Sequence, residues 1–355
     1  MSKATPVHFV GSIPLPDSAT TFEHISSALP NPGQVKRIPD GEPGQRDYFV
    51  RWQKSVFQDA GVGHVLMQAF QPDGWKSHSQ QEVQETMQRM PKLETKYDVE
   101  AIKSYKTFCE VREKGRISRG VKFQVSIPTP DNFIGTNIQP DFQAPIAPLY
   151  QDALIRAIRN TQAHIPHEDL AIQLDVALEI ALLHGTWYDE FQGPVSYLPI
   201  KARKDVLMPI IVEKIVSLAN AVAGDVELGF HFCYGDLFNK HFLQPPSTAL
   251  IAELAANILS RLHRPVAWIH FPVPKDRTDE AYLLPLKTTL LPKLDAETEV
   301  YVGLIHAYDF EGTRRRLEVA RRVLGGGIGV STECGLGRKD GAWLGSVLEI
   351  ANAVQ

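Results

Sequence analysis

The sequence predicts a single (β/α)8 barrel, a TIM barrel, from three observations. Short apolar runs alternate along the chain with longer segments whose apolar residues recur at helical spacing, which is the pattern of repeated βα units. Most of the apolar runs are continuous, as expected for strands that are buried on both faces of a parallel sheet. The length of 355 residues also suits one elaborated barrel, because eight βα units occupy about 250 residues before insertions. We therefore expect one catalytic domain over residues 1–355.

Nine segments are candidate strands, one more than a barrel of this kind needs. They are Val7–Val10, Gln34–Ile38, His64–Phe70, Val121–Ile127, Leu170–Asp175, Val226–Phe232, Val266–His270, Val300–His306 and Gly327–Thr332. Since His64–Phe70 runs into a turn-rich stretch, we expect it to form part of a hairpin inserted after the second βα unit. An open doubly wound sheet is the alternative, but no G-x-G-x-x-G pattern follows the first strand.

Helical patterns lie between the predicted strands, with apolar residues three and four apart and charged residues between them. They cover Arg46–Asp59, Val99–Lys114, Ala147–Thr161, Leu198–Ala223, Ser247–Leu262, Ala281–Leu294, Gly312–Leu324 and Asp340–Val354. The glycines of Gly325–Gly327 are expected to end a helix before the last strand.

The composition excludes several classes of partner. Hydrophobic residues make up 43% of the chain and charged residues 22%, which is typical of a soluble globular protein. The net charge of -4 gives no basic surface for nucleic acid or an anionic membrane. No apolar run approaches the roughly 20 residues that span a bilayer, and the start at Met1–Pro6 has no hydrophobic signal region. With only three cysteines and no disulfide framework, we expect a cytoplasmic protein.

Polar residues cluster where the predicted strands end, which is the end of a barrel that carries catalytic groups. These residues are Ser12, Asp40 with Glu42, Asp175, His231 with Cys233, His270, His306 with Asp309, and Glu333 with Cys334. Each residue alone has an ordinary structural explanation, such as a turn, a helix cap or a core histidine. As a set at one face of the barrel, they predict a functional site.

The strongest part of this set is a zinc site. His231 and Cys233 are two residues apart in a predicted strand, so they point to the same side. Imidazole nitrogen and thiolate sulfur are zinc ligands. Cys334 follows another short strand into a glycine-rich loop, and His270 is a candidate further ligand.

The residues resemble a family. His231–Tyr234 together with Cys334–Leu336 is similar to the zinc motif in the C-terminal catalytic barrel of cobalamin-independent methionine synthases. Val10–Pro14 resembles the G-S-F-P start of these enzymes, Asp40–Glu42 their H-G-E segment, and Ile172–Asp175 their Q-(V/I)-D-E-P strand. The matches occur in the family's order over nearly the whole chain. The chain resembles the short, stand-alone members of this family more than the long ones. It also resembles the wider superfamily that includes uroporphyrinogen decarboxylase and the zinc-dependent corrinoid and coenzyme M methyltransferases.

The resemblance implies a metal and a substrate. In that family the H-x-C pair, a glutamate after the sixth strand and the last-strand cysteine hold a zinc ion, which keeps the homocysteine sulfur as a thiolate. It further implies that Ser12, Glu42 and Asp175 hold the amino and backbone groups of an amino-acid-like substrate. Arg338, just past the last cysteine, is a candidate for binding a substrate anion.

Three departures leave the substrates open. Where the family has its glutamate, this chain has His270, which either replaces it or leaves the position without a ligand. Asp175 is followed by Val176 and Ala177 in place of Glu-Pro. The chain also lacks the separate N-terminal barrel that the long synthases use with folate substrates.

Three functions follow from these residues. The leading one is a zinc-dependent methyltransferase that activates a small thiol, with a folate or another methyl donor. The alternative is a lyase or hydrolase in which zinc acts as a Lewis acid on a carbonyl or carboxylate, with His306, Asp309 and Glu333 as acid–base groups. The third is a zinc-stabilised binding or sensor protein, whose site would be closed by four protein ligands. Trp75 and Trp187–Tyr188 are candidates for lining a substrate pocket.

Overall fold

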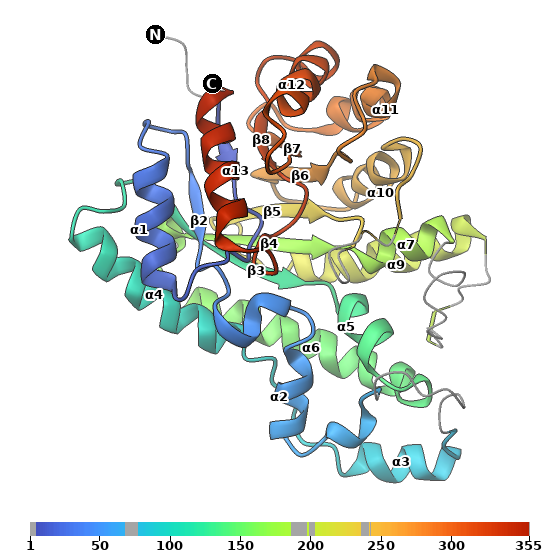
Figure 1. Ribbon diagram of the computed structural model, residues 1–355. Helices are drawn as coiled ribbons and strands as arrows, with labels where there is room; N and C mark the ends of the chain where they lie inside the picture. Colours follow the sequence, from blue (N-terminus) through green and yellow to red (C-terminus); the bar gives the residue numbers. More distant parts are fainter. Residues whose placement is uncertain are drawn as a thin grey trace.

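Eight parallel strands form one sheet in the order β1-β8-β7-β6-β5-β4-β3-β2 in the computed structural model (Figure 1). The structure describes residues 5–67, 77–185, 197–198, 203–235, 241 and 243–354. A parallel bridge between Val7 and Val35 brings β1 next to the segment that leads into β2, so the sheet forms a nearly closed barrel. The strands are β1 (Val7–His8), β2 (Arg37–Pro39), β3 (Lys122–Pro128), β4 (Leu170–Val176), β5 (Glu227–Phe232), β6 (Trp268–Pro272), β7 (Glu299–Ile305) and β8 (Gly329–Thr332).

The predicted barrel and its eight strands are confirmed, whereas the inserted hairpin is not shown. Gly63–Val65 forms a single 3₁₀ turn, and Leu66 makes one isolated antiparallel bridge with Ile138. Leu66 therefore pairs with a distant part of the chain. Residues 68–76, including Trp75, lie outside the described residues, as does the Trp187–Tyr188 pair.

Helices surround the barrel, and several begin with capping side chains that the sequence supplies. Asp17 accepts a hydrogen bond from the Thr20 amide at 2.7 Å to start α1, and Asp340 accepts one from the Trp343 amide at 3.1 Å to start α13. The described helices are α1 (Ser18–Ala28), α2 (Gln53–Asp59), α3 (Gln80–Gln88), α4 (Tyr97–Glu113), α5 (Pro130–Asn137), α6 (Pro140–His164), α7 (Leu178–His184), α9 (Lys204–Ala219), α10 (Ala249–Leu259), α11 (Glu280–Pro285), α12 (Phe310–Leu324) and α13 (Gly341–Ala353).

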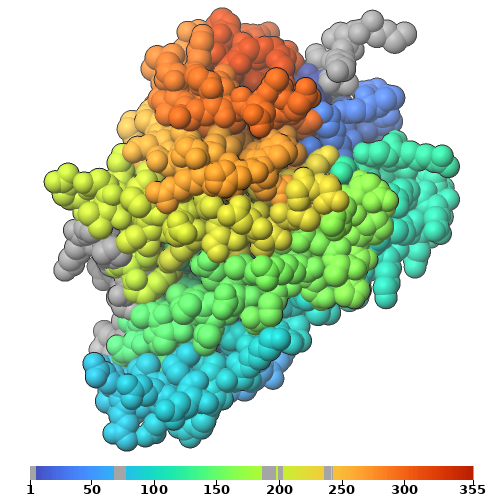
Figure 2. Space-filling view, turned by 180° about the vertical axis from the view of Figure 1, so that it is seen from behind, coloured from blue at the N-terminus to red at the C-terminus, as the bar shows by residue number. Residues whose placement is uncertain are grey.

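The last helix closes the ring of helices against the first. α13 lies beside α1 in Figure 1, and Asn352 of α13 donates a hydrogen bond of 2.8 Å to the Ala28 carbonyl at the end of α1. Seen from behind, the segments between them follow one another in chain order across the molecule (Figure 2). Neighbouring βα units in the sequence are therefore neighbours in space. Among the described residues, no helix combines the length and the apolar character that a membrane crossing requires.

The barrel interior carries polar side chains from one end to the other. The amino-end ion network consists of Arg37, Lys122, Glu227 and Glu299, each the first residue of its strand, together with Lys36. The Arg37 guanidinium also lies 4.2 Å from the centre of the Trp268 ring. That ring covers Gly229 so closely that an added Cβ would lie 1.9 Å from it.

Candidate metal centre

His231, Cys233 and Cys334 come together at the carboxyl end of the barrel. One ligand atom from each lies within 4.8 Å of the others. His231 is in β5, and the Cys233 amide donates a 2.8 Å hydrogen bond to the Val176 carbonyl, which extends the pairing of β5 with β4. Cys334 follows β8, and its sulfur lies 3.7 Å from that of Cys233. Two segments a hundred residues apart thus supply one cluster of metal-binding atoms.

His231 has one ring nitrogen bonded and one without a partner. Its Nδ1 lies 2.7 Å from Nδ1 of His270, which is its register partner on β6. Its Nε2 is buried and has no hydrogen-bond partner among the described residues. Leaving such an atom unpaired costs about 1–3 kcal/mol, a cost that a bound metal would remove. Burial, and then the neighbouring His270, lowers the pKa of His231 well below its usual value, so the ring is neutral and able to bind a metal.

The donor set fits zinc. Zn²⁺ is bound in proteins by thiolate sulfur and neutral imidazole nitrogen, and tetrahedral coordination with Zn–S distances of about 2.3 Å places two sulfurs about 3.8 Å apart. The observed separation of 3.7 Å agrees with this spacing. Three protein ligands leave one tetrahedral position open, which is the arrangement of catalytic zinc sites.

The structure places His270 beside this cluster and outside the group of three ligand residues. Its Nε2 lies 3.0 Å from the carbonyl oxygen of Thr332, and its Nδ1 faces His231. Both ring nitrogens therefore have partners. The side chain is fully buried, and burial lowers its pKa to about 3, so this imidazole is also neutral.

His306 and Glu333, two of the predicted acid–base residues, lie next to each other. His306 Nδ1 is 3.3 Å from a Glu333 carboxylate oxygen, and His306 Nε2 is 3.0 Å from the Val273 carbonyl. His241 approaches the other Glu333 oxygen at 3.9 Å. Burial lowers the pKa of His306 to about 4. Because Glu333 immediately precedes Cys334, this pair borders the metal ligands.

Asp309, the third predicted acid–base residue, is engaged elsewhere. It stands at the start of α12, and its carboxylate lies 2.8 Å from the guanidinium of Arg316. Arg316 is itself buried and donates to the Leu304 carbonyl at 3.1 Å. Asp309 therefore pairs with Arg316, whereas His306 and Glu333 pair with each other.

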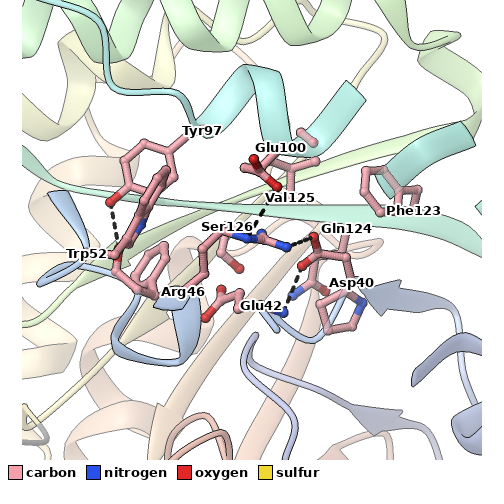
Figure 3. Close-up of a pocket in the computed structure, with 13 residues that line it drawn as sticks. Asp40, Glu42, Arg46, Trp52, Tyr97, Glu100, Phe123, Gln124, Val125 and Ser126 are labelled. Atoms are coloured by element: carbon pink, nitrogen blue, oxygen red, sulfur yellow. Dashed lines mark hydrogen bonds and ion pairs between the residues drawn. The ribbon is translucent and has the colours of Figure 1, made fainter. Parts of the chain in front are cut away.

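Glu42 lies at the edge of a pocket beside β2 and β3 (Figure 3). The pocket has a charged wall of Asp40, Glu42, Arg46 and Glu100 and an aromatic wall of Phe49, Trp52 and Tyr97. Asp40 is held by Arg46 at 2.7 Å and by the Ser104 hydroxyl at 2.6 Å. Glu42 adopts a positive φ of 52°, and its amide donates to Asp40 at 2.9 Å, so the turn aims its carboxyl group inward.

Glu42 and Asp175 are both buried acids. Burial, followed by the charges of Asp40 and Asp175, raises the pKa of Glu42 well above its usual value. Burial likewise raises the pKa of Asp175, and the nearby Cys334 adds to the effect. Asp175 is therefore close enough to influence Glu42, and Cys334 is close enough to influence Asp175.

Ser12 and Arg338 connect the loops around this site. The Ser12 carbonyl accepts a hydrogen bond from the Leu336 amide at 2.7 Å, and its hydroxyl accepts one from the Gly337 amide at 3.2 Å. Arg338 donates to the Asp47 carbonyl at 3.2 Å, with its guanidinium 5.3 Å from the centre of the Tyr48 ring. The loop that carries Cys334 is therefore fastened to the loop after β1.

Sequence reasoning missed a row of polar residues inside the barrel. Gln124 and Ser126 of β3 and Gln173 of β4 alternate with apolar neighbours, and Gln173 donates to Asp175 at 2.8 Å. This period of two within otherwise apolar strands was the signal that could have found them. His8 is a further such residue, whereas His241 follows no pattern in the sequence.

No known family profile matches the sequence, and no curated protein matches it. Solved structures do resemble it. A vitamin-B12-independent methionine synthase from a Shewanella species, in complex with selenomethionine, is 13% identical with a TM-score of 0.52, over 99% of this chain and 97% of that one. A Listeria monocytogenes protein described as a candidate vitamin-B12-independent methionine synthase is 14% identical with a TM-score of 0.49, over 95% and 87%. The chain therefore has the barrel fold seen in the Shewanella methionine synthase over nearly its full length.

Proposed function

We propose that this protein is a zinc-dependent enzyme that binds a small thiol at the metal centre and transfers a methyl group to it. The observation that carries the proposal is the convergence of His231, Cys233 and Cys334, with a buried Nε2 of His231 that lacks a hydrogen-bond partner among the described residues. Zn²⁺ bound there would favour the thiolate form of a coordinated thiol at neutral pH.

The buried acids supply the means to hold an amino-acid-like thiol. Glu42 and Asp175 would accept hydrogen bonds from a substrate ammonium group, whose positive charge would restore the carboxylate form that burial disfavours. Arg338, at the mouth of the site, would face a substrate carboxylate. Ser12 would act indirectly, because its carbonyl and hydroxyl oxygens already hold the loop that carries Cys334.

The His306–Glu333 pair would accept the proton that the incoming thiol loses. The His306 Nε2 proton is directed at the Val273 carbonyl, so the Nδ1 atom is left as an acceptor facing Glu333. One proton held between these two atoms makes their 3.3 Å contact favourable. The methyl donor, a folate or another carrier, is assigned only by the resemblance to methionine synthases.

A cobalt-substituted protein would test thiol binding. Each thiolate on Co²⁺ adds a charge-transfer absorption band in the near ultraviolet, so homocysteine or cysteine should increase this absorption beyond that of the two protein thiolates. Homoserine and methionine are the matched controls, since neither can supply a thiolate. Equal spectra with homocysteine and homoserine would contradict the proposal.

The same experiment addresses the alternative function, a lyase or hydrolase that uses zinc as a Lewis acid. The specific observation in its favour is the His306–Glu333 pair beside the metal ligands, because a proton donor and acceptor at that place suits carbonyl chemistry. A spectrum that responds to small carboxylates and not to thiols would support this second function.

A further inference from the structure

We infer that His270 is a positioning residue that holds His231 with Nε2 towards the metal, so that the centre has three protein ligands. The inference rests on the zinc centre of the proposed function and names the residue that orients its imidazole ligand. Its basis is a chain of hydrogen bonds from the Thr332 carbonyl through both imidazoles.

The direction of each hydrogen bond follows from the Thr332 carbonyl, which can act only as an acceptor. The proton of the neutral His270 ring must therefore lie on Nε2. His270 Nδ1 is then an acceptor, and the 2.7 Å contact requires a proton on Nδ1 of His231. One proton on each ring satisfies both contacts and leaves Nε2 of His231 with a lone pair and no proton. That atom is the buried one without a hydrogen-bond partner among the described residues.

The chain of hydrogen bonds also reaches the opposite side of the metal centre. Thr332 lies two residues before Cys334, and its hydroxyl donates to the Cys334 carbonyl at 2.8 Å. The segment that carries the last thiol is therefore the segment that anchors His270. His270 of β6 thus links the imidazole ligand of β5 to the segment after β8 that carries the last thiol.

The test compares His270→Leu, which removes both hydrogen bonds, with His270→Asn, whose side-chain oxygen can replace Nδ1 as the acceptor for His231. His8→Leu is the matched control. His8 is equally buried, its ring centre lies 5.6 Å from that of His270, and it bonds to Gln173 at 2.8 Å, away from the ligands. Competition with a chelator should show about 10- to 100-fold weaker zinc binding for His270→Leu. His270→Asn should recover most of it, and His8→Leu should stay within about threefold of wild type.

Two measurements on the wild-type zinc protein need no variant. Nitrogen-15 NMR of its histidines should show His231 protonated at Nδ1 and metal-bound at Nε2. X-ray absorption should show two sulfurs and one imidazole nitrogen. Two imidazole nitrogens, or zinc affinity unchanged in His270→Leu, would overturn the inference while leaving thiol binding intact. Failure of homocysteine to alter the cobalt spectrum would instead overturn the proposed function and leave the role of His270 standing.

Discussion

The two ends of the barrel differ in whether their polar side chains are paired with one another. At the amino end, Arg37 lies 2.5 Å from Glu227 and 2.8 Å from Glu299, and Lys122 lies 3.4 Å from Glu227. Each charge of this network has an opposite charge beside it. At the carboxyl end, Nε2 of His231 lies near two thiols and has no hydrogen-bond partner among the described residues. A network in which each charge has an opposite partner stabilises the fold, whereas a buried ligand nitrogen without such a partner indicates a site for something not part of the chain.

The interior between the two ends is continuous. Trp268, above Arg37, lies 5.8 Å from His8 between ring centres, and His8 lies 5.6 Å from His270. Trp268, His8 and His270 thus form a column of neighbouring rings between the two ends. Substitutions near the amino end of this column should affect stability, and substitutions near its carboxyl end should affect metal binding. The following variants test that separation.

The largest effect is expected from the thiols. Cys233→Ser or Cys334→Ser should remove most of the bound zinc, because a site with three protein ligands keeps only two. Metal analysis of protein purified without chelators measures the loss. Cys109→Ser is the matched control, since this half-buried cysteine of α4 is not one of the ligand residues and should leave the zinc content unchanged. Stoichiometric zinc in the double variant would defeat the account.

Arg37→Met should have the next largest effect, on stability alone. Removal of the guanidinium leaves Glu227 and Glu299 without their buried partner, which should lower the free energy of unfolding by about 3 kcal/mol. Chemical denaturation of the metal-free protein measures the change. The zinc content of the folded protein should equal that of wild type, and a parallel loss of zinc would show that the two ends are not separate.

His8, which lies between Trp268 and His270, should make the free energy of unfolding depend on pH. Burial is the main cause that holds its pKa well below the usual value. In acid the unfolded chain takes up a proton at this residue and the folded protein does not, so the stability falls as the pH drops below about 6.5. In His8→Leu, the slope of unfolding free energy between pH 6.5 and 5 should be shallower by up to ~1.4 kcal/mol per pH unit. Identical slopes would mean that His8 is protonated in the fold.

The smallest effect is expected at Lys36, the most exposed member of the amino-end ion network. It pairs with Glu299, but 43% of its side chain is exposed to solvent. Lys36→Met should therefore cost less than about 1 kcal/mol, and salt should reduce that cost further. A loss as large as that of Arg37→Met would show that the network acts as one unit.

Much of the barrel could be predicted from the sequence because its strands are continuous apolar runs. Two of the helices that were not predicted have a physical reason in common. α5 and α7 directly follow strands and are buried on nearly all sides, so their residues show no alternation of polar and apolar faces. The segment His64–Phe70 is apolar as well, yet its described part forms a turn and an isolated bridge. Hydrophobicity alone did not distinguish it from a barrel strand.

Two of the candidate metal ligands, His231 and Cys233, could be predicted because a spacing of two residues in a strand fixes a common side. The position of His270 could not. Whether its nitrogens face a metal, a carbonyl or another imidazole depends on the register of β5 with β6 and on the path of Thr332. Neither is encoded in a local pattern. Arg46 and Tyr97 of the pocket are likewise brought together by packing between distant segments.

The zinc content and zinc coordination of the purified wild-type protein test the central claim most directly. The account predicts one zinc ion per chain, with an X-ray absorption spectrum of two sulfur ligands, one imidazole nitrogen and one further light atom. A protein that takes up no zinc, or a zinc ion without sulfur ligands, would contradict it.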